Sequence, residues 1–551
     1  MTQDRNFRLD RRELMTLLAG AAASGPAAAG GGATAAAVSA ASGARKYKSM
    51  FPHDSFREWM DDIERRGLVM RQKRVDQDAY EMTAIAYRMM DCLGMYEAPA
   101  YLAEEVKIDG KWQKGPVIFN HMGHWDTEAI ALGLEPVPNH GIETYRNVIQ
   151  YILDLLEKNG GKLPQIPPVE VPRDKAPVKE QVYTGDDIDI TQFPFITSNP
   201  GDSGRYVNTG SVFTEDVELG KNFGTYRCQI KGPRKIGVNP EPGQGAWKMF
   251  MAKKERGEKE AVVSIVLGQD PMIWTISGSA IAKSGKEDEL ALAGGLRGKP
   301  VEVVKSETNN MMIPANAEMV IEGIVPLDAP MEPEGPFGEM YGYLGLKKSE
   351  NFFMNITAIT CRKDPWILNQ FTGVTRGFVT APLEGVSLAR LRKLAPQIVA
   401  FHSPVEATGL GFLSIKKTKP GQALSIGKRV ARIVPITKVL VVVDAEDIDV
   451  YNRRQMMFAM GSRWQPFPAT EIIESARGMP LDPSSPNRPM SSKIIIDATR
   501  QWPEEGGPEE YPALNRTLLE DLAPESFERV DAEWGDMLED WLKLRRRRVR
   551  R

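Results

Sequence analysis

Two glutamates, Glu334 and Glu339, enclose a Gly-Pro-Phe-Gly turn. Glycine permits tight backbone paths and the close approach of a ligand, while proline and phenylalanine stiffen and desolvate the turn. A carboxylic acid beside apolar groups keeps its proton more readily, so it can donate a proton near neutral pH. Two carboxylates in unlike surroundings can divide the roles of acid and charged partner. Taken alone, the segment also fits an ordinary turn with two solvated glutamates.

A second segment with chemical potential runs from Asn222 to Arg227 and reads Asn-Phe-Gly-Thr-Tyr-Arg. An arginine can bind a substrate carboxylate through two parallel hydrogen bonds. An asparagine oxygen is a hard ligand that suits Mg²⁺, Mn²⁺ or Ca²⁺. Taken alone, this stretch is an ordinary β-strand.

The elements that must position these groups change character along the chain. Apolar residues at helical spacing predict a helix over 142–158, and Gly160 suits its C-terminal cap. Five prolines between 164 and 177 predict an extended linker. From about 178 to 360, short β-branched runs separated by turn residues predict a barrel or a sandwich.

After Thr360 the pattern alternates between helix and strand, which is typical of an α/β domain. Strands are expected at Ile415 and over 439–443, and helices over 387–394 and 427–433. A last helix is expected over 531–544, with apolar residues that could pack on another subunit.

Composition excludes several classes of protein. The 551 residues are 42% hydrophobic and 26% charged, which is ordinary for globular domains, and the net charge of -3 gives no general attraction for nucleic acid. The arginines at 545–548, 550 and 551 are interpreted as a solvated tail, with an anionic contact as the alternative.

Three cysteines without a CxxC pair exclude a disulfide framework. His121 and His124 form an HxxH pair that we interpret as structural, for want of a third ligand.

The first 45 residues carry a different signal. Arg11 and Arg12 precede a short apolar run, 14–23, and then small residues, a pattern that resembles a twin-arginine export signal. The run is too short to span a membrane. Periplasmic export is therefore expected, and a disordered cytosolic leader is the alternative.

Taken together, these segments resemble the UbiD decarboxylase family, over about 178–502. The matching stretches keep a common order and spacing; they are 222–227, 237–246, 268–271, 296–305, 314–323, 334–339 and 494–500. The resemblance implies an α+β / α/β multidomain fold around a flavin-reductase-like split β-barrel. It divides the chain into a leader over 1–45, an N-terminal α/β domain over 46–175, the barrel over 176–360, a C-terminal α/β domain over 361–530 and a helix with a basic tail over 531–551.

The resemblance also assigns roles to residues. Arg227 matches the catalytic arginine, Glu334 the glutamate that pairs with it, and Glu339 the proton donor. Asn222 and Glu289 match two ligands of a divalent metal, usually manganese, with magnesium or potassium as further candidate cations. Prenylated FMN is the implied cofactor, and the residues assigned to it are Asn222, Thr225, Tyr226, Arg227, Asn239, Pro240, Gln244, Glu289 and Lys416.

One position departs from the family pattern. The third metal ligand is usually a histidine just before a Gly-Ala or similar pair, and Gln244 takes its place here. A glutamine oxygen can still coordinate a hard cation, so Gln244 is kept as the third predicted ligand. A weaker or different metal, or direct contacts to the cofactor phosphate, are the alternatives.

The implied reaction is the reversible removal of CO₂ from an aromatic, heteroaromatic or α,β-unsaturated acid. A flavin prenyltransferase would supply the cofactor, and a homo-oligomer, dimer or hexamer, is expected. Thr372, Thr375 and Arg376 could bind a polar ring, although an exposed loop explains them equally well. The rival interpretations are a carboxylase, a non-catalytic flavin-binding protein and an ordinary flavin reductase.

Overall fold

The computed structural model describes residues 48–279, 281–282, 287–376 and 380–548, so the predicted export signal lies outside the described part of the chain. Residues from Ser49 onward form one compact unit. Within the described residues, no helix combines the length and the apolar character that crossing a membrane requires.

The N-terminal region places helices against a four-stranded sheet of order β1-β2-β3-β17. The strands are β1 (Val69–Asp76), β2 (Ala100–Ile108), β3 (Lys111–Phe119) and β17 (Ile367–Leu368). The helices are α2 (Phe56–Arg65), α3 (Glu81–Leu93), α4 (Thr127–Ala131) and α5 (Gly141–Lys158). The helix predicted over 142–158 is thus confirmed as α5. Ser55 caps α2 by accepting a hydrogen bond from the backbone N of Glu58, 3.2 Å away.

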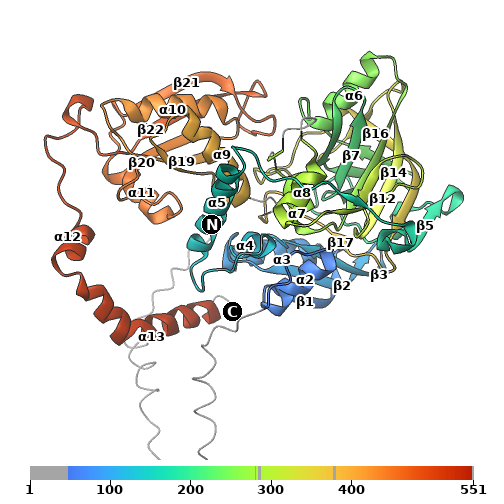
Figure 1. The fold of residues 1–551 in the computed structure, drawn as a ribbon, viewed down its shortest axis with the longest axis horizontal. Coiled ribbons are helices and arrows are strands. Elements are labelled where there is room, and N and C mark those ends of the chain that lie inside the picture. Colours follow the sequence, from blue (N-terminus) through green and yellow to red (C-terminus); the bar gives the residue numbers. More distant parts are fainter. Residues whose placement is uncertain (1–47, 280, 283–286, 377–379, 549–551) are drawn as a thin grey trace, which may run out of the picture. The chain divides into compact units, whose positions relative to one another are not determined.

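The central region contains a ten-stranded sheet, part of which is labelled in Figure 1. Its main path is β6-β9-β10-β16-β14-β11-β7-β8, and β5 and β15 pair with β16. The strands are β5 (Gln181–Thr184), β6 (Tyr206–Val207), β7 (Ser211–Asp216), β8 (Gly220–Thr225), β9 (Cys228–Gly232), β10 (Lys235–Val238), β11 (Glu260–Leu267), β14 (Met319–Pro326), β15 (Glu332–Glu334) and β16 (Lys348–Cys361).

The predicted split barrel is not confirmed, because no ladder among the described residues joins β6 to β8 at the two ends of this path. The sheet is therefore open. One edge strand, β8, is contacted by helices, which is a common way to protect an edge strand. The flanking helices are α6 (Gly245–Glu255), α7 (Pro271–Ser277) and α8 (Glu289–Arg297).

The proline-rich segment is extended, as predicted, and it also contributes a short strand. β4 (Val169–Glu170) pairs in parallel with β12 (Glu302–Lys305), which in turn pairs with β13 (Met312–Pro314). Prolines at 164, 167, 168 and 172 flank the short strand β4. Proline has no backbone N–H, and outside the strand this group is not needed for a ladder hydrogen bond.

The C-terminal region is an α/β unit with a five-stranded sheet of order β18-β19-β20-β22-β21. Its strands are β18 (Ile398–His402), β19 (Leu410–Ile415), β20 (Val439–Asp444), β21 (Thr470–Arg477) and β22 (Met490–Asp497). β19, β20 and β22 run parallel, and the two edge strands run antiparallel to them. Figure 1 shows α10 (Gln422–Ile433) beside this sheet; α9 (Ala381–Leu394) and α11 (Arg453–Ser462) complete the unit.

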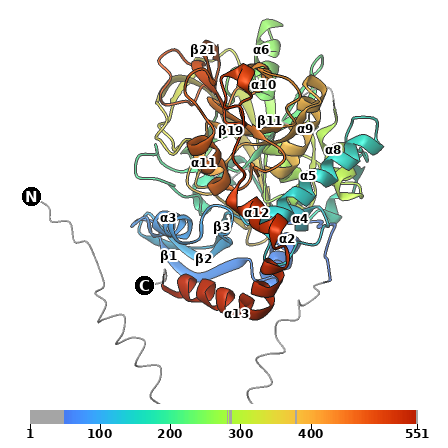
Figure 2. The ribbon, with the colours of Figure 1, turned by 90° about the vertical axis from the view of Figure 1, so that its left-hand side faces the viewer.

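Two helices follow, α12 (Asn515–Leu522) and α13 (Glu525–Arg548), with a break at Ala523 (Figure 2). The last predicted helix is confirmed, although it begins six residues earlier than expected. Its Trp534, Met537 and Leu538 are about half exposed.

Candidate active site

Arg227 is held between the two glutamates of the Gly-Pro-Phe-Gly turn. It lies in the connection between β8 and β9, whereas Glu334 ends β15 and Glu339 follows the turn. Its Nε donates to Glu334 Oε1 at 2.9 Å and its Nη2 to Glu334 Oε2 at 2.7 Å. Its Nη1 donates to Glu339 Oε1. The three predicted residues therefore lie together. Glu334 accepts two parallel hydrogen bonds from the guanidinium, and Glu339 accepts one from its remaining nitrogen.

The trio is shielded from water. The side chain of Glu334 is 1% exposed, that of Arg227 9% and that of Glu339 10%. Burial lowers the pKa of Arg227, but the ion pairs with Glu334 and Glu339 outweigh burial and raise it, so the guanidinium stays charged. Burial raises the pKa of Glu339, although Arg227 opposes the rise. The Glu339 carboxyl group thus holds a proton more readily than a solvated glutamate, although it lies beside a permanent cation.

A set of supporting contacts around the turn was not predicted from the sequence. Tyr206 donates its hydroxyl to Glu334 Oε1 at 3.2 Å, and Asp202 accepts the backbone N–H of Gly338 at 2.8 Å. Ser203 Oγ donates to the carbonyl of Gly335 at 2.6 Å. The segment 199–204 is rich in turn residues, but no spacing rule connects it to a turn more than 130 residues away.

A cavity of about 280 Å³ opens beside Arg227 and Glu339. Its walls come from the segment after Glu339 and from the loop between β21 and β22. Apolar lining residues are Leu344, Leu346, Pro480, Leu481 and Pro483. Such a cavity, apolar with a few charged groups, is suited to a planar organic acid.

The segment after Asn369 supports the turn instead of lining the cavity. Gly373 has φ +77°, and a Cβ there would lie 2.3 Å from the carbonyl oxygen of Glu339, so only glycine fits. Thr372, Thr375 and Arg376, predicted as a ring-binding group or an exposed loop, do not line this cavity, and Thr375 and Arg376 are buried. Arg376 is buried and pairs with Glu128 at 2.6 Å, because an arginine removed from water needs a carboxylate partner.

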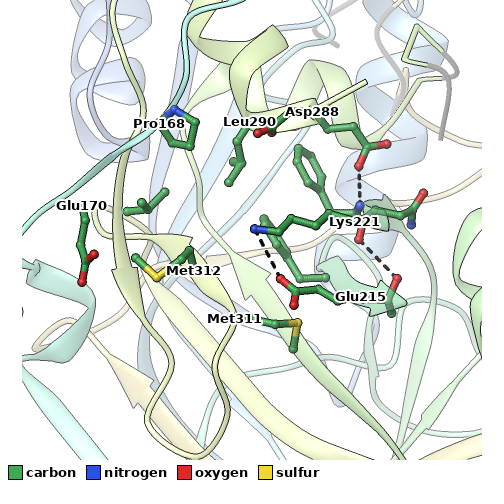
Figure 3. A pocket seen from close by; sticks show the side chains of 14 residues that line it. Pro168, Glu170, Glu215, Lys221, Asp288, Leu290, Met311 and Met312 are labelled. Atoms are coloured by element: carbon green, nitrogen blue, oxygen red, sulfur yellow. Dashed lines mark hydrogen bonds and ion pairs between the residues drawn. The ribbon is translucent and has the colours of Figure 1, made fainter. Parts of the chain in front are cut away.

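A second cavity, of about 220 Å³, contains two of the predicted metal ligands (Figure 3). Asn222, on β8, and Glu289, at the start of α8, both line it. Glu289 Oε2 accepts the backbone N–H of Phe223 at 2.6 Å, and burial raises the pKa of Glu289 to about 8. Figure 3 also shows Lys221 directed toward Glu215, 3.8 Å away.

The side-chain oxygen of Gln244, the third predicted ligand, is bound within its own loop. Its side chain is exposed, and its Oε1 accepts the backbone N–H of Glu241 at 2.6 Å within its own loop. The backbone beside it is close to Asn222, because a Cβ on Gly245 would lie 2.0 Å from Asn222 Oδ1. Among the described residues, no group of three or more His, Cys, Asp or Glu side chains is placed to hold a metal. The predicted site of Asn222, Gln244 and Glu289 has one carboxylate and two amides, so that finding does not bear on it and the site stays a prediction.

The other residues predicted to bind the cofactor fall into two groups. Thr225, Tyr226, Asn239 and Pro240 adjoin Arg227: the Thr225 hydroxyl lies 2.8 Å from that of Ser277, and the backbone N of Asn239 donates to the Arg227 carbonyl at 3.2 Å. Tyr226 is buried and its hydroxyl accepts the backbone N–H of Ala246 at 3.3 Å. Lys416, by contrast, is exposed after β19 and lines neither cavity.

The HxxH pair is structural, as predicted. His121 is buried and its Nδ1 lies 3.0 Å from Trp59 Nε1, which donates to it. Its pKa is lowered to about 3 by burial, so the ring is neutral. His124 Nδ1 accepts the backbone N–H of Asp126 at 3.1 Å, in a separate turn.

Comparisons with known proteins agree with this arrangement. Residues 169–375 match the model of the 3-octaprenyl-4-hydroxybenzoate carboxy-lyase Rift-related domain (UbiD), and residues 378–498 match that of the corresponding C-terminal domain. A phenolic acid decarboxylase of Sedimentibacter hydroxybenzoicus is 30% identical over 524 residues, which cover 92% of this chain and all of the relative.

Solved structures give the same result. The open form of vanillic acid decarboxylase from Sedimentibacter hydroxybenzoicus superposes with a TM-score of 0.72 at 26% identity, covering 89% of this chain and 99% of that one. The UbiD-class enzyme HmfF from Pelotomaculum thermopropionicum, in complex with FMN, gives 0.70 at 26% identity over 84% and 97% of the two chains.

Proposed function

We propose that this chain, which belongs to the UbiD family and is a carboxy-lyase, removes CO₂ from an aromatic or other unsaturated carboxylic acid with prenylated FMN. The observation that carries the proposal is the Arg227–Glu334–Glu339 trio at the wall of an apolar cavity. The relatives named as phenolic acid and vanillic acid decarboxylases, and the FMN bound by a third, support the substrate class and the flavin.

Arg227 would bind the substrate carboxylate. Glu334 occupies the Nε–Nη2 edge of the guanidinium, so the Nη1 side, where Glu339 now accepts, is the side left for the substrate. A carboxylate that displaces Glu339 keeps a negative charge beside Arg227, and Glu339 can then carry its proton as a neutral acid. Leu344, Leu346 and Leu481 line the cavity and would contact the ring.

Loss of CO₂ from an sp² carbon leaves an electron pair that no side chain can accept, and prenylated FMN supplies that electron sink when bound. Thr225, Tyr226, Asn239 and Pro240 adjoin Arg227 and would hold this cofactor. Glu339 would then deliver its proton to the carbon that lost CO₂. Glu334 would keep Arg227 in place through both steps, because its hydrogen bonds are to Nε and Nη2 and leave Nη1 free for the substrate.

The identity of the cofactor tests the proposal. The protein should be co-expressed with a flavin prenyltransferase, the proposed supplier, and the released cofactor examined by mass and visible spectrum. We expect prenylated FMN and CO₂ release from at least one aromatic acid in a panel. Unmodified FMN together with NAD(P)H oxidation would favour a flavin reductase, and exchange of labelled bicarbonate into the acid would measure the carboxylase direction.

The pH dependence of turnover should report on Glu339. The protonated form of Glu339 is lost as pH rises through its raised pKa, so turnover should fall on the alkaline side of the pH profile. Glu241 is one of the negative charges that raise this pKa. Glu241→Gln should therefore move the alkaline limb to lower pH. Glu332→Gln, which removes a carboxylate paired with Lys235 outside the cavity, is the matched control. If the alkaline side of the pH profile stays in place in Glu241→Gln, the fall in turnover there does not report the titration of Glu339.

The metal content should differ from that of a three-ligand site. Because Gln244 is turned toward Glu241, we expect the flavin-loaded protein to hold less than one manganese per chain and to keep its flavin in EDTA. Gln244→His should raise the metal content measured by plasma mass spectrometry, while Gln244→Ala should leave it unchanged. One tightly held manganese per chain in the natural sequence, lost in Gln244→Ala, would contradict this expectation.

Two further features are proposals that await their own tests. The Arg11-Arg12 pattern supports export by the twin-arginine route, which an Arg→Lys pair at 11 and 12 should block. The half-exposed apolar residues of α13 support homo-oligomer formation through that helix. Light scattering of a chain ending before α13 would test the second feature.

A further inference from the structure

The cavity beside Arg227 carries positive charge that no acid balances. Its charged lining residues are Arg227, Glu241, Glu339, Lys347, Lys348 and Arg488. Glu339 accepts from Arg227, and Glu241 pairs with Lys348. Within the part of the chain that the structure describes, Lys347 and Arg488 have neither an ion pair nor a side-chain hydrogen bond. Both side chains are exposed, so two solvent-accessible cations beyond the catalytic arginine line the same cavity.

The loop that carries Arg488 is firmly held. It connects β21 to β22, and its Asp482 is 2% exposed. Asp482 Oδ1 accepts Lys438 Nζ at 3.1 Å and the backbone N–H of Ser484 at 3.0 Å. At the base of the loop, the backbone N of Gly478 donates to the Pro489 carbonyl at 2.7 Å. A side chain on such a loop loses less entropy when it binds a ligand than one on a mobile segment.

The loop also lies beside the catalytic turn. Thr408 Oγ1, just before β19, donates to the carbonyl of Met340 at 3.2 Å, which ties the C-terminal unit to the residue after Glu339. Burial and, to a lesser degree, the charge of Asp482 raise the pKa of Tyr341, so Asp482 lies within electrostatic range of the segment after Glu339. Pro480 and Leu481 of the loop face the cavity together with Leu344 and Leu346. A ring in this cavity would therefore contact both segments.

We propose that Arg488 binds a second carboxylate of the substrate, so that the preferred substrate is an aromatic dicarboxylic acid. This inference rests on the proposed function, because it takes the carboxylate that is lost to be the one on Arg227. Arg488 is assigned the role in preference to Lys347 because the planar guanidinium matches a carboxylate with two parallel hydrogen bonds. Lys347 adds positive charge at the same cavity.

Binding of non-physiological acids to the flavin-loaded protein tests the proposal without turnover. Isothermal titration calorimetry would compare benzoate with benzene-1,3- and benzene-1,4-dicarboxylate at pH 7.5. The natural protein should bind one of the dicarboxylates more tightly than benzoate. Arg488→Gln should weaken the affinity for that dicarboxylate by about tenfold or more and change the affinity for benzoate by less than about twofold. Arg488→Lys should recover part of the loss.

Two controls make the outcome decisive. Arg432→Gln removes an exposed arginine of the same unit that lines neither cavity, and it should change none of the affinities. Equal weakening of benzoate and dicarboxylate by Arg488→Gln, or no preference for either dicarboxylate in the natural protein, would overturn the assignment. If Arg227→Ala leaves the affinity for benzoate unchanged, the result counts against the proposed function itself and not against the role of Arg488.

Discussion

Turnover by the Glu339→Gln variant should fall by about 10²- to 10⁴-fold while the cofactor remains bound. Glutamine has nearly the same shape, and its amide oxygen can still accept from Arg227 Nη1, so the trio should keep its geometry. The amide has no proton of suitable acidity to give to carbon. Steady-state CO₂ release and the visible spectrum of the holoenzyme would measure the two halves of this prediction.

The control for Glu339→Gln is Glu332→Gln, which alters a carboxylate of the same segment whose partners are Lys231 and Lys235. Its turnover should match that of the natural protein. Full steady-state decarboxylation by Glu339→Gln would remove Glu339 from the role of donor. Loss of the flavin spectrum would instead show that Glu339 holds the cofactor site together.

Arg227→Ala should lose both the substrate and the cofactor. The variant has no guanidinium for the carboxylate, and it leaves Glu334 buried with the Tyr206 hydroxyl as its remaining side-chain partner. Removing one member of a buried ion pair costs about 3–5 kcal/mol of stability, unless the carboxyl group takes up a proton. Flavin content, benzoate affinity and thermal unfolding should therefore change together.

A loss of stability alone could imitate this result, so a second arginine variant is needed. Arg463 is equally buried, and it pairs with Asp444 and Asp447 in the C-terminal unit. Arg463→Ala should lower the unfolding temperature to a similar degree but leave benzoate affinity unchanged at a temperature where both variants are folded. A normal flavin spectrum and a normal rate in Arg227→Ala would contradict the role of Arg227.

The catalytic trio was predicted from the resemblance to the UbiD family, whose matching segments keep a common order and spacing. Taken alone, the turn from Glu334 to Glu339 also fits two solvated glutamates, and the stretch before Arg227 fits an ordinary strand. The strands β11 and β20, by contrast, were predicted from the residues themselves. Both are buried β-branched runs, which leave few alternatives to a strand in a sheet core.

Other parts of the site depend on side-chain directions that sequence patterns do not carry. Gln244 occupies the expected position, but its amide closes its own loop instead of turning toward Asn222. Arg376 has the chemistry of a ligand group, yet Glu128, some 250 residues earlier, neutralises it in the core. The open sheet was missed because alternation along strands shows which residues are buried but not whether the first and last strands meet.

The most direct test of the account follows the proton that Glu339 delivers. Holoenzyme in D₂O should convert an accepted aromatic acid to CO₂ and a product with one deuterium on the carbon that carried the carboxylate. Mass spectrometry and NMR of the product would locate the label. Release of CO₂ without deuterium at that carbon, or no CO₂ from any acid despite intact prenylated FMN, would contradict the central claim.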